Sequence, residues 1–144
     1  MKKIIALSLL FAAATPVVGH EGVKNQAVIE RMKNMQVIKD GMGVLGGMAK
    51  GAVAFDAAQA EAALASLKAA SEQIAPTFEA NETDPKSESL PAIWANWDDF
   101  VEKADDFSFM LEGTDVSSLD GIRAGMGNIG GTCSACHKQY RMKK

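Results

Sequence analysis

The C-terminal segment carries two cysteines and a histidine at a spacing that can hold a porphyrin covalently. The residues are Cys133-Ser134-Ala135-Cys136-His137, and only seven residues follow them. Two thiols at positions i and i+3 can add to the two vinyl groups of one haem, and the next histidine can supply an axial nitrogen to the iron. At about 100° per residue, Cys133, Cys136 and His137 fall within an arc of roughly 100° on a helix. One helical face could therefore hold the porphyrin edge and the iron, which predicts one covalent haem c per chain.

Three other uses of a Cys-x-x-Cys pair need features that this chain lacks. A structural zinc site needs four ligands, whereas the sequence has two cysteines and two histidines, with His20 far from the pair. A thioredoxin-like dithiol begins a helix after a strand, and no strand pattern precedes these cysteines. A disulfide between residues three apart closes a very short loop and stabilises little. Haem attachment is therefore favoured over zinc, a redox dithiol and a disulfide.

Residues 1–19 have the composition of a cleaved secretory signal. A basic start is followed by an apolar stretch and small residues, and no acidic residue occurs before Glu21. The apolar stretch is too short to span a bilayer, so we expect export without a membrane anchor. Cleavage fits after Ala14 or after Gly19, and we favour Gly19, which leaves one mature domain at residues 20–144. Because bacteria attach haem covalently outside the cytoplasmic membrane, we expect the periplasm.

The charge of the mature chain argues against a nucleic-acid partner. Removing residues 1–19 takes away two lysines and no acidic residue, so 13 basic and 18 acidic side chains remain, a net charge of about −5. Polyanions repel such a chain. The sequence also shows no phosphate-binding loop and no nucleophile paired with a base, so we do not predict an enzyme.

Four stretches with apolar residues spaced three and four apart predict an all-α fold. They cover about 24–50, 56–76, 91–113 and 117 to the end of the chain, and a polar, proline-containing loop is expected over 76–91. Asp56 is a suitable N-cap and Gly51 a suitable C-cap. The other connections are short, which favours an antiparallel up-down-up-down four-helix bundle.

The predicted inward faces place both cysteines toward the interior. Arg31 occupies the one inward position of the first stretch that is not apolar. Because the cysteines lie on the inward face of the last stretch, we expect the haem inside the bundle. The expected core residues are Val28, Met35, Ile38, Met42, Leu45, Ala49, Ala60, Leu64, Leu67, Ile74, Ile93, Trp97, Phe100, Ala104, Phe107, Leu111, Leu119, Ile122, Met126, Ile129, Cys133, Cys136 and Tyr140.

Glycines interrupt the first and last helical stretches, where each costs up to about 1 kcal/mol relative to alanine. They indicate either flexible or wrongly assigned helix, or a close approach of the backbone to a flat cofactor or a neighbouring helix. We favour close approach. The residues are Gly41, Gly43, Gly46, Gly47, Gly121, Gly125, Gly127, Gly130 and Gly131.

This layout resembles the class II c-type cytochromes, the group that includes cytochrome c prime and its low-spin, methionine-ligated relatives. The resemblance covers the mature chain and rests on the haem motif near the C-terminus. A first helix of Arg-x-x-x-Met type that ends in the Met-Ala-Lys-Gly run at 48–51 and a Pro-x-Ile-Trp segment at 91–94 support it. It implies that Cys133 and Cys136 are the thioether attachment points and that His137 is the proximal iron ligand.

The resemblance also gives roles to residues outside the motif. Arg31 would lie near the haem propionates; the alternative is a side chain that reaches solvent beside the core. Met35, one turn later, either binds the iron on the distal side or only packs there. Arg141 would pair with a propionate, or would only offset the dipole at the helix end. His20 is better placed on an N-terminal tail than at a metal.

Two functions follow, and the state of the iron separates them. If Met35 binds the iron, the chain is a one-electron carrier that serves redox partner proteins. If the distal side is open, it is a five-coordinate haem protein that binds NO or CO. A helical interaction module that never receives haem is a third alternative, which the Cys-x-x-Cys-His motif opposes. The resemblance leaves both a monomer and a homodimer open.

Overall fold

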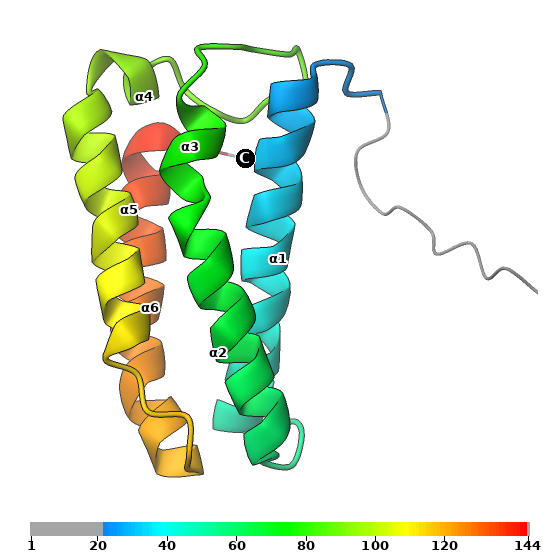
Figure 1. Ribbon diagram of the computed structural model, residues 1–144, viewed down its shortest axis with the longest axis vertical. Helices are drawn as coiled ribbons and strands as arrows, with labels where there is room; N and C mark the ends of the chain where they lie inside the picture. The colour runs from blue at the N-terminus through cyan, green and yellow to red at the C-terminus, as the bar shows by residue number, and fades with distance from the viewer. Residues whose placement is uncertain (1–21, 144) are drawn as a thin grey trace, which may run out of the picture.

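Four long helices run alternately down and up along one axis (Figure 1). The computed structural model describes residues 22–143, so the predicted signal at 1–19 and His20 lie outside the described residues. The all-α, up-down-up-down four-helix bundle is confirmed. None of the helices in the described part of the chain is long and apolar enough to cross a membrane. The elements are α1 (Gln26–Ala49), α2 (Ala57–Glu72), α3 (Ile74–Phe78), α4 (Ala92–Ala95), α5 (Trp97–Glu112) and α6 (Leu119–Tyr140).

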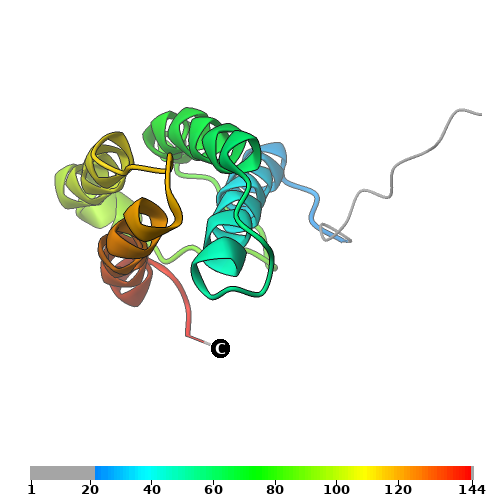
Figure 2. The same ribbon diagram turned by 90° about the horizontal axis from the view of Figure 1, so that it is seen from below.

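The four long helices surround the bundle axis in the order α1, α2, α5 and α6, and α6 packs back against α1 (Figure 2). Each helix therefore contacts the helix before and after it in the chain. The pairing of α1 with α6 joins the two ends of the described chain. This pairing brings the helix that carries Met35 next to the helix that carries both cysteines.

The predicted helix boundaries around the connection between α1 and α2, and at the start of α6, are confirmed. The Asp56 carboxylate accepts a hydrogen bond from the backbone N–H of Gln59 at 3.0 Å, so Asp56 caps α2. Gly51 adopts a φ of 71° after α1, the left-handed conformation that favours glycine at a helix end. The Ser118 hydroxyl accepts from the backbone N–H of Gly121 at 3.1 Å and caps α6.

Two predicted boundaries are wrong. The second helix does not run to Pro76: α2 ends at Glu72, and α3 then continues through Pro76. Proline is tolerated there because its missing N–H falls within the first turn of α3, where the N–H groups have no helical acceptor. The long loop is therefore 79–91. The third helix is broken at Asn96, whose φ of −132° and ψ of 53° separate α4 from α5.

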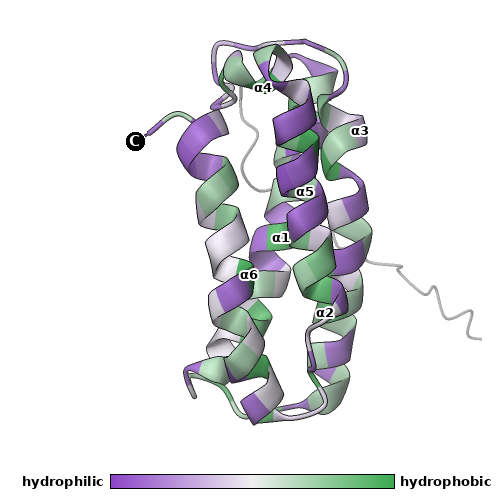
Figure 3. Cartoon of the chain, turned by 90° about the vertical axis from the view of Figure 1, so that its left-hand side faces the viewer, coloured by the Kyte–Doolittle hydropathy of each residue, from purple (hydrophilic) through white to green (hydrophobic). Residues whose placement is uncertain are grey.

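The predicted inward faces form the core, and the hydropathy colours of Figure 3 alternate around each helix accordingly. Met48 was not predicted in the core and is 1% exposed. Several predicted core residues remain partly exposed although they pack against the core, and most lie on α1 and α6. They are Met35, Met42, Ala49, Leu64, Trp97, Leu119, Met126, Cys133 and Cys136.

The glycines of α1 differ in what surrounds them. A Cβ added at Gly41 would lie 2.8 Å from Leu67 Cγ, whereas one added at Gly43 would meet nothing within 4 Å. Close approach of a neighbouring helix therefore explains Gly41 and leaves Gly43 unexplained. In α6, an added Cβ at Gly121 or Gly125 would meet Asp115 or Thr114, respectively, from the connection between α5 and α6.

We expect alanine to have opposite effects at these two positions of α1. Gly41→Ala should lower the free energy of unfolding by about 1–3 kcal/mol, because Leu67 is fully buried and has no room to move. Gly43→Ala should raise it by about 1 kcal/mol, because alanine favours an exposed helical position. Urea denaturation of the two variants measures both changes. Equal effects at both sites would contradict the close packing of α1 on α2.

The start of α1 is tied to the 79–91 loop by Asp84. Its carboxylate accepts hydrogen bonds from the backbone N–H groups of Lys86 at 2.9 Å, Lys24 at 2.9 Å and Asn25 at 3.2 Å. These bonds, first that of Lys86 and then that of Lys24, lower the pKa of Asp84 below its usual 3.8.

This depressed pKa predicts an acid-sensitive contribution to stability. The unfolded chain protonates Asp84 first, so the contribution is complete above about pH 4 and is lost as the pH falls through the folded-state pKa. We expect Asp84→Asn to lower the melting temperature at pH 7 and to flatten the loss of stability between pH 5 and pH 3. The exposed Glu61→Gln is the control. Melting curves of both variants across this pH range, parallel to the parent protein, would contradict this role.

Candidate haem site

The two cysteines of the motif lie half-buried on α6 and pack against the core. Both are free thiols. His137 follows Cys136 on the same helix and is exposed. Since the helix continues through all three residues, the 100° arc expected from the sequence applies.

The protonation of these groups argues against a redox dithiol. Burial raises the pKa of both thiols, that of Cys136 to about 11. They are therefore neutral at pH 7, whereas a reactive dithiol depends on a lowered thiol pKa. Partial desolvation of the imidazole by the groups around it, and then the positive charge of Arg141, lowers the pKa of His137, which favours the neutral form with a nitrogen lone pair to donate. Among residues 22–143 no group of three or more His, Cys, Asp or Glu side chains could hold a metal ion.

This donor set fits haem c. Two free thiols three residues apart and a neutral imidazole are the groups that the covalent attachment and one axial bond require. A porphyrin also needs apolar surroundings. Half-buried apolar side chains from α1, α4 and α6 pack against the same core as the cysteines, and they are Met35, Met42, Trp94 and Met126.

Met35 lies on the helix next to the one that carries the haem motif. It is half-buried on α1, one turn after Arg31, and it packs against the core that also receives Cys133 and Cys136. α1 is a direct neighbour of α6. Met35 and the cysteines therefore come from facing helices, although they are about 100 residues apart in the sequence.

Arg31 is enclosed by protein, so the alternative that its side chain reaches solvent beside the core is wrong. It is 2% exposed. Its Nε donates to Thr77 O at 2.9 Å, Nη1 donates to Glu82 O at 2.7 Å, and Nη2 donates to Ala80 O. Burial lowers the pKa of Arg31, and the charge of Glu82 opposes this. The guanidinium thus joins α1 to the chain that leaves α3.

Two aromatic rings complete the enclosure of Arg31. Its Cζ lies 4.9 Å from the centroid of Phe78 and 5.2 Å from that of Trp94, so both rings make cation–π contacts. The Trp94 indole donates to Phe78 O at 2.8 Å. Trp94, which packs against the core, is therefore held in place by its contacts with Arg31 and Phe78.

Arg141 binds a carboxylate at the end of α6. Its Nε and Nη2 lie 2.7 Å and 2.6 Å from Glu88 Oε2. The backbone also pairs here, since Leu90 N donates to Tyr140 O at 2.9 Å and Met142 N donates to Glu88 O at 2.8 Å. The last part of the 79–91 loop therefore fixes the helix end within one turn of His137. Arg31 and Arg141 share no partner.

Tyr140 and Asp99 form a contact that the sequence did not reveal. Tyr140 is 3% exposed, its hydroxyl donates to the Asp99 carboxylate, and its ring meets Phe100 edge-on at 5.4 Å. Burial, and then the hydrogen bond to Asp99, raises the pKa of Tyr140 to about 12. The tyrosine at a predicted core position could have indicated such a contact, because a buried hydroxyl needs a hydrogen-bond partner. The contact fixes α6 against α5 beside the haem motif.

The comparisons with known proteins agree with this site. Residues 26–141 match the family model described as Cytochrome C'. A cytochrome c-554 of Cereibacter sphaeroides is 36% identical over an alignment of 163 positions that covers 99% of each chain. A cytochrome c-556 of Agrobacterium tumefaciens (strain apple 185) is 36% identical over 118 residues, which cover 79% of this chain and 93% of the relative.

A solved structure extends the likeness to three dimensions. It is a variant of cytochrome c prime from Alcaligenes xylosoxidans in complex with nitric oxide, 30% identical, with a TM-score of 0.74 over 82% of this chain and 94% of that chain. The matched residues 26–141 contain α1 to α6 and the whole Cys-x-x-Cys-His motif. The chain therefore belongs to the cytochrome c' family, the class II c-type cytochromes, whose cofactor is a covalently bound haem c.

Proposed function

We propose that this protein is a periplasmic monohaem cytochrome that carries one electron at a time between redox partners. One observation carries the proposal: α6 presents two free, half-buried thiols toward the core with a neutral imidazole directly after them. Cys133 and Cys136 would form the two thioether bonds, and His137 would supply the proximal nitrogen. When bound, haem c supplies an iron centre that gains and loses a single electron.

Met35 would supply the second axial group. A thioether is a neutral, polarisable donor that raises the reduction potential. Its place on α1, which packs against α6, and its contact with the same core as the cysteines support this role. The side chain of Met35 would also keep water and small gases from the iron.

Arg31 and Arg141 are proposed to balance the propionate charges. Arg31 has five N–H groups, and three of them bind carbonyls, so two remain. Arg141 keeps Nη1 outside its ion pair with Glu88. Each guanidinium could therefore bind a carboxylate without giving up its present partners.

Spectroelectrochemical titration of the purified haem protein tests the carrier function. We expect one reversible transition that fits a single electron per chain, and rapid oxidation by a small neutral oxidant. Slow or irreversible oxidation would contradict the function while leaving the haem attachment intact. The matched control is His137→Ala, which should keep the thioether bonds and lose the native spectrum and potential.

Gas binding is the second candidate, and a specific observation favours it. The Alcaligenes relative, 30% identical to this chain, has been solved as a nitric oxide complex. If Met35 only packs against the core, the same fold would leave the distal side of the iron open to NO or CO.

We further propose that residues 1–19 direct export and that cleavage after Gly19 leaves the domain at 20–144. The basic and apolar composition of the segment supports this. The mass of the purified periplasmic protein should correspond to a chain that begins at His20 plus one haem. A mass that includes Met1 would contradict it.

A further inference from the structure

The outer face of α5 leaves an aromatic ring and four carboxylates in solvent. Phe109 is 72% exposed, the most exposed of the large apolar side chains among the described residues. The exposed Asp98, Glu102, Asp105 and Asp106 lie on the same side of the helix. None of the four makes a hydrogen bond or salt bridge within residues 22–143. Exposed Phe109 buries no apolar surface within this chain, so the ring is available to another molecule.

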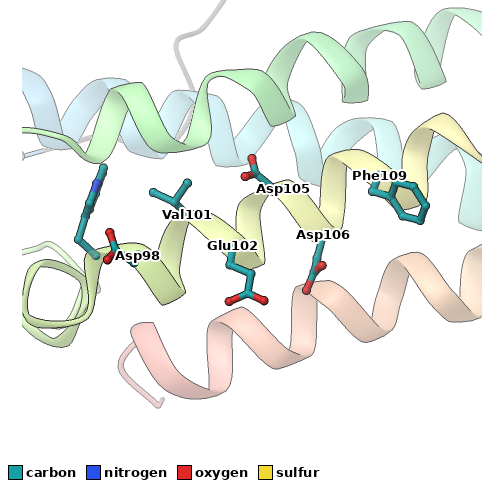
Figure 4. A pocket seen from close by; sticks show the side chains of 7 residues that line it. Asp98, Val101, Glu102, Asp105, Asp106 and Phe109 are labelled. Atoms are coloured by element: carbon teal, nitrogen blue, oxygen red, sulfur yellow. The ribbon is translucent and has the colours of Figure 1, made fainter.

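Two open depressions adjoin this surface. The first, of about 470 Å³, runs along α5 from Trp97 past Val101 to Phe109, with the four carboxylates around it (Figure 4). In Figure 4 the labelled side chains all come from α5, and the carboxylates of Glu102 and Asp106 extend toward α6. An aromatic side chain with an apolar floor and a charged rim is the composition of an interface centre.

The second depression leads from this surface to the haem motif. It measures about 520 Å³ between α5 and α6, shares Asp106 with the first, and reaches Thr132 and Ala135. These two residues directly precede Cys133 and Cys136. Small residues of α6, with open space above Gly127 and Gly131, let another molecule approach the backbone closely there.

We propose that this α5–α6 face, defined by the two depressions, is the docking surface for a basic redox protein. A rim of lysines or arginines on the partner would meet the four carboxylates, and an apolar patch would receive Phe109. The proposal rests on the electron-carrier function and names its partner class. A partner seated here would lie against the helix that carries the attachment cysteines.

The charge of the face selects this occupant over a second copy of the chain. Two copies joined through α5 would bring eight unpaired carboxylates together, and like charges across an interface oppose binding. Lys103, the cation that lines the second depression, is engaged by Asp99 at 3.0 Å. Anionic lipid and nucleic acid are disfavoured for the same reason.

Binding between oxidised proteins tests the surface without any electron transfer. The probe is an oxidised c-type cytochrome of net positive charge, titrated calorimetrically into the oxidised holo-protein at low ionic strength. The quadruple variant Asp98→Asn, Glu102→Gln, Asp105→Asn and Asp106→Asn should bind at least about tenfold more weakly. Phe109→Ala should weaken binding by about tenfold as well. Salt near 1 M should remove the difference between the parent and the quadruple variant, but not the effect of Phe109→Ala.

A charge-matched control separates a docking face from general attraction. It removes four carboxylates from exposed positions of α1 and α2, namely Glu30→Gln, Asp40→Asn, Glu61→Gln and Glu72→Gln. We expect less than a twofold change in binding. An equal loss in the control and the quadruple variant would overturn the proposal. So would sedimentation of a parent dimer that Phe109→Ala converts to a monomer, because the face would then join two copies.

Reaction with a small neutral oxidant separates the two proposals. Unchanged oxidation rates with the small oxidant in every variant, together with the loss of probe binding in the α5 variants, support the docking face. If the parent protein binds the probe through this face but exchanges no electron with the small oxidant, the carrier function fails and the docking face stands. If electron exchange is rapid but the α5 variants bind the probe like the parent protein, only the docking face fails.

Discussion

Replacing both Cys133 and Cys136 with serine is expected to abolish the haem stain of the denatured chain completely. Denaturation removes every non-covalent contact, so only thioether bonds keep haem on the polypeptide. Each single variant should retain a reduced stain through its remaining thioether. Ser134→Ala, at the exposed position between them, is the control and should stain fully.

The same variants should differ in stability and colour. Because haem binds the folded chain, its loss from the double variant should lower the melting temperature more than any surface substitution does. His137→Ala separates attachment from ligation, since it should keep the stain and lose the native axial field. A full stain in the double cysteine variant would contradict the assignment of both thioether bonds. An unchanged ferrous spectrum in His137→Ala would contradict the assignment of the proximal ligand.

Replacing Arg31 with methionine is expected to lower the free energy of unfolding by about 3 kcal/mol or more. The substitution leaves the carbonyls of Thr77, Ala80 and Glu82 without the charged donor to which each makes a part-buried hydrogen bond, and a hydrogen bond to a charged group contributes about 1.5–3 kcal/mol. It also removes the cation from between Phe78 and Trp94. Urea denaturation measures the change.

Arg31→Lys is the informative control for this prediction. Lysine keeps the charge, but its compact ammonium cannot match the planar fork that serves three carbonyls and contacts two rings. We therefore expect a partial loss of stability, between the parent protein and the methionine variant. A loss below about 1 kcal/mol in the methionine variant would show that the 77–82 segment is held by other contacts.

Local patterns in the sequence predicted most of the bundle. Apolar spacing predicted the four long helices, and Asp56 and Gly51 were correctly identified as helix boundaries because caps depend on residues only a few positions apart. The inward direction of Cys133 and Cys136 followed from the same spacing. These features need no knowledge of distant contacts.

The sequence did not predict two kinds of feature: changes of helix boundary where the apolar spacing continues, and contacts between distant segments. α3 continues through Pro76, and Asn96 breaks the third stretch, although the apolar spacing alone is continuous at both places. Arg31 binds carbonyls about 50 residues away, and Tyr140 meets Asp99 some 40 residues back. A sequence shows that a buried arginine or tyrosine needs partners, but the fold decides which groups reach it.

The proposed electron-carrier function requires protein side chains at both axial positions of the iron. Optical spectra of the purified haem protein, oxidised and reduced, with and without CO, measure this directly. We expect sharp ferrous bands that CO leaves unchanged, with Met35→Leu converting them to broad bands that CO shifts. Broad ferrous bands that shift with CO in the parent protein would contradict this expectation, and would make NO or CO binding the function of this cytochrome.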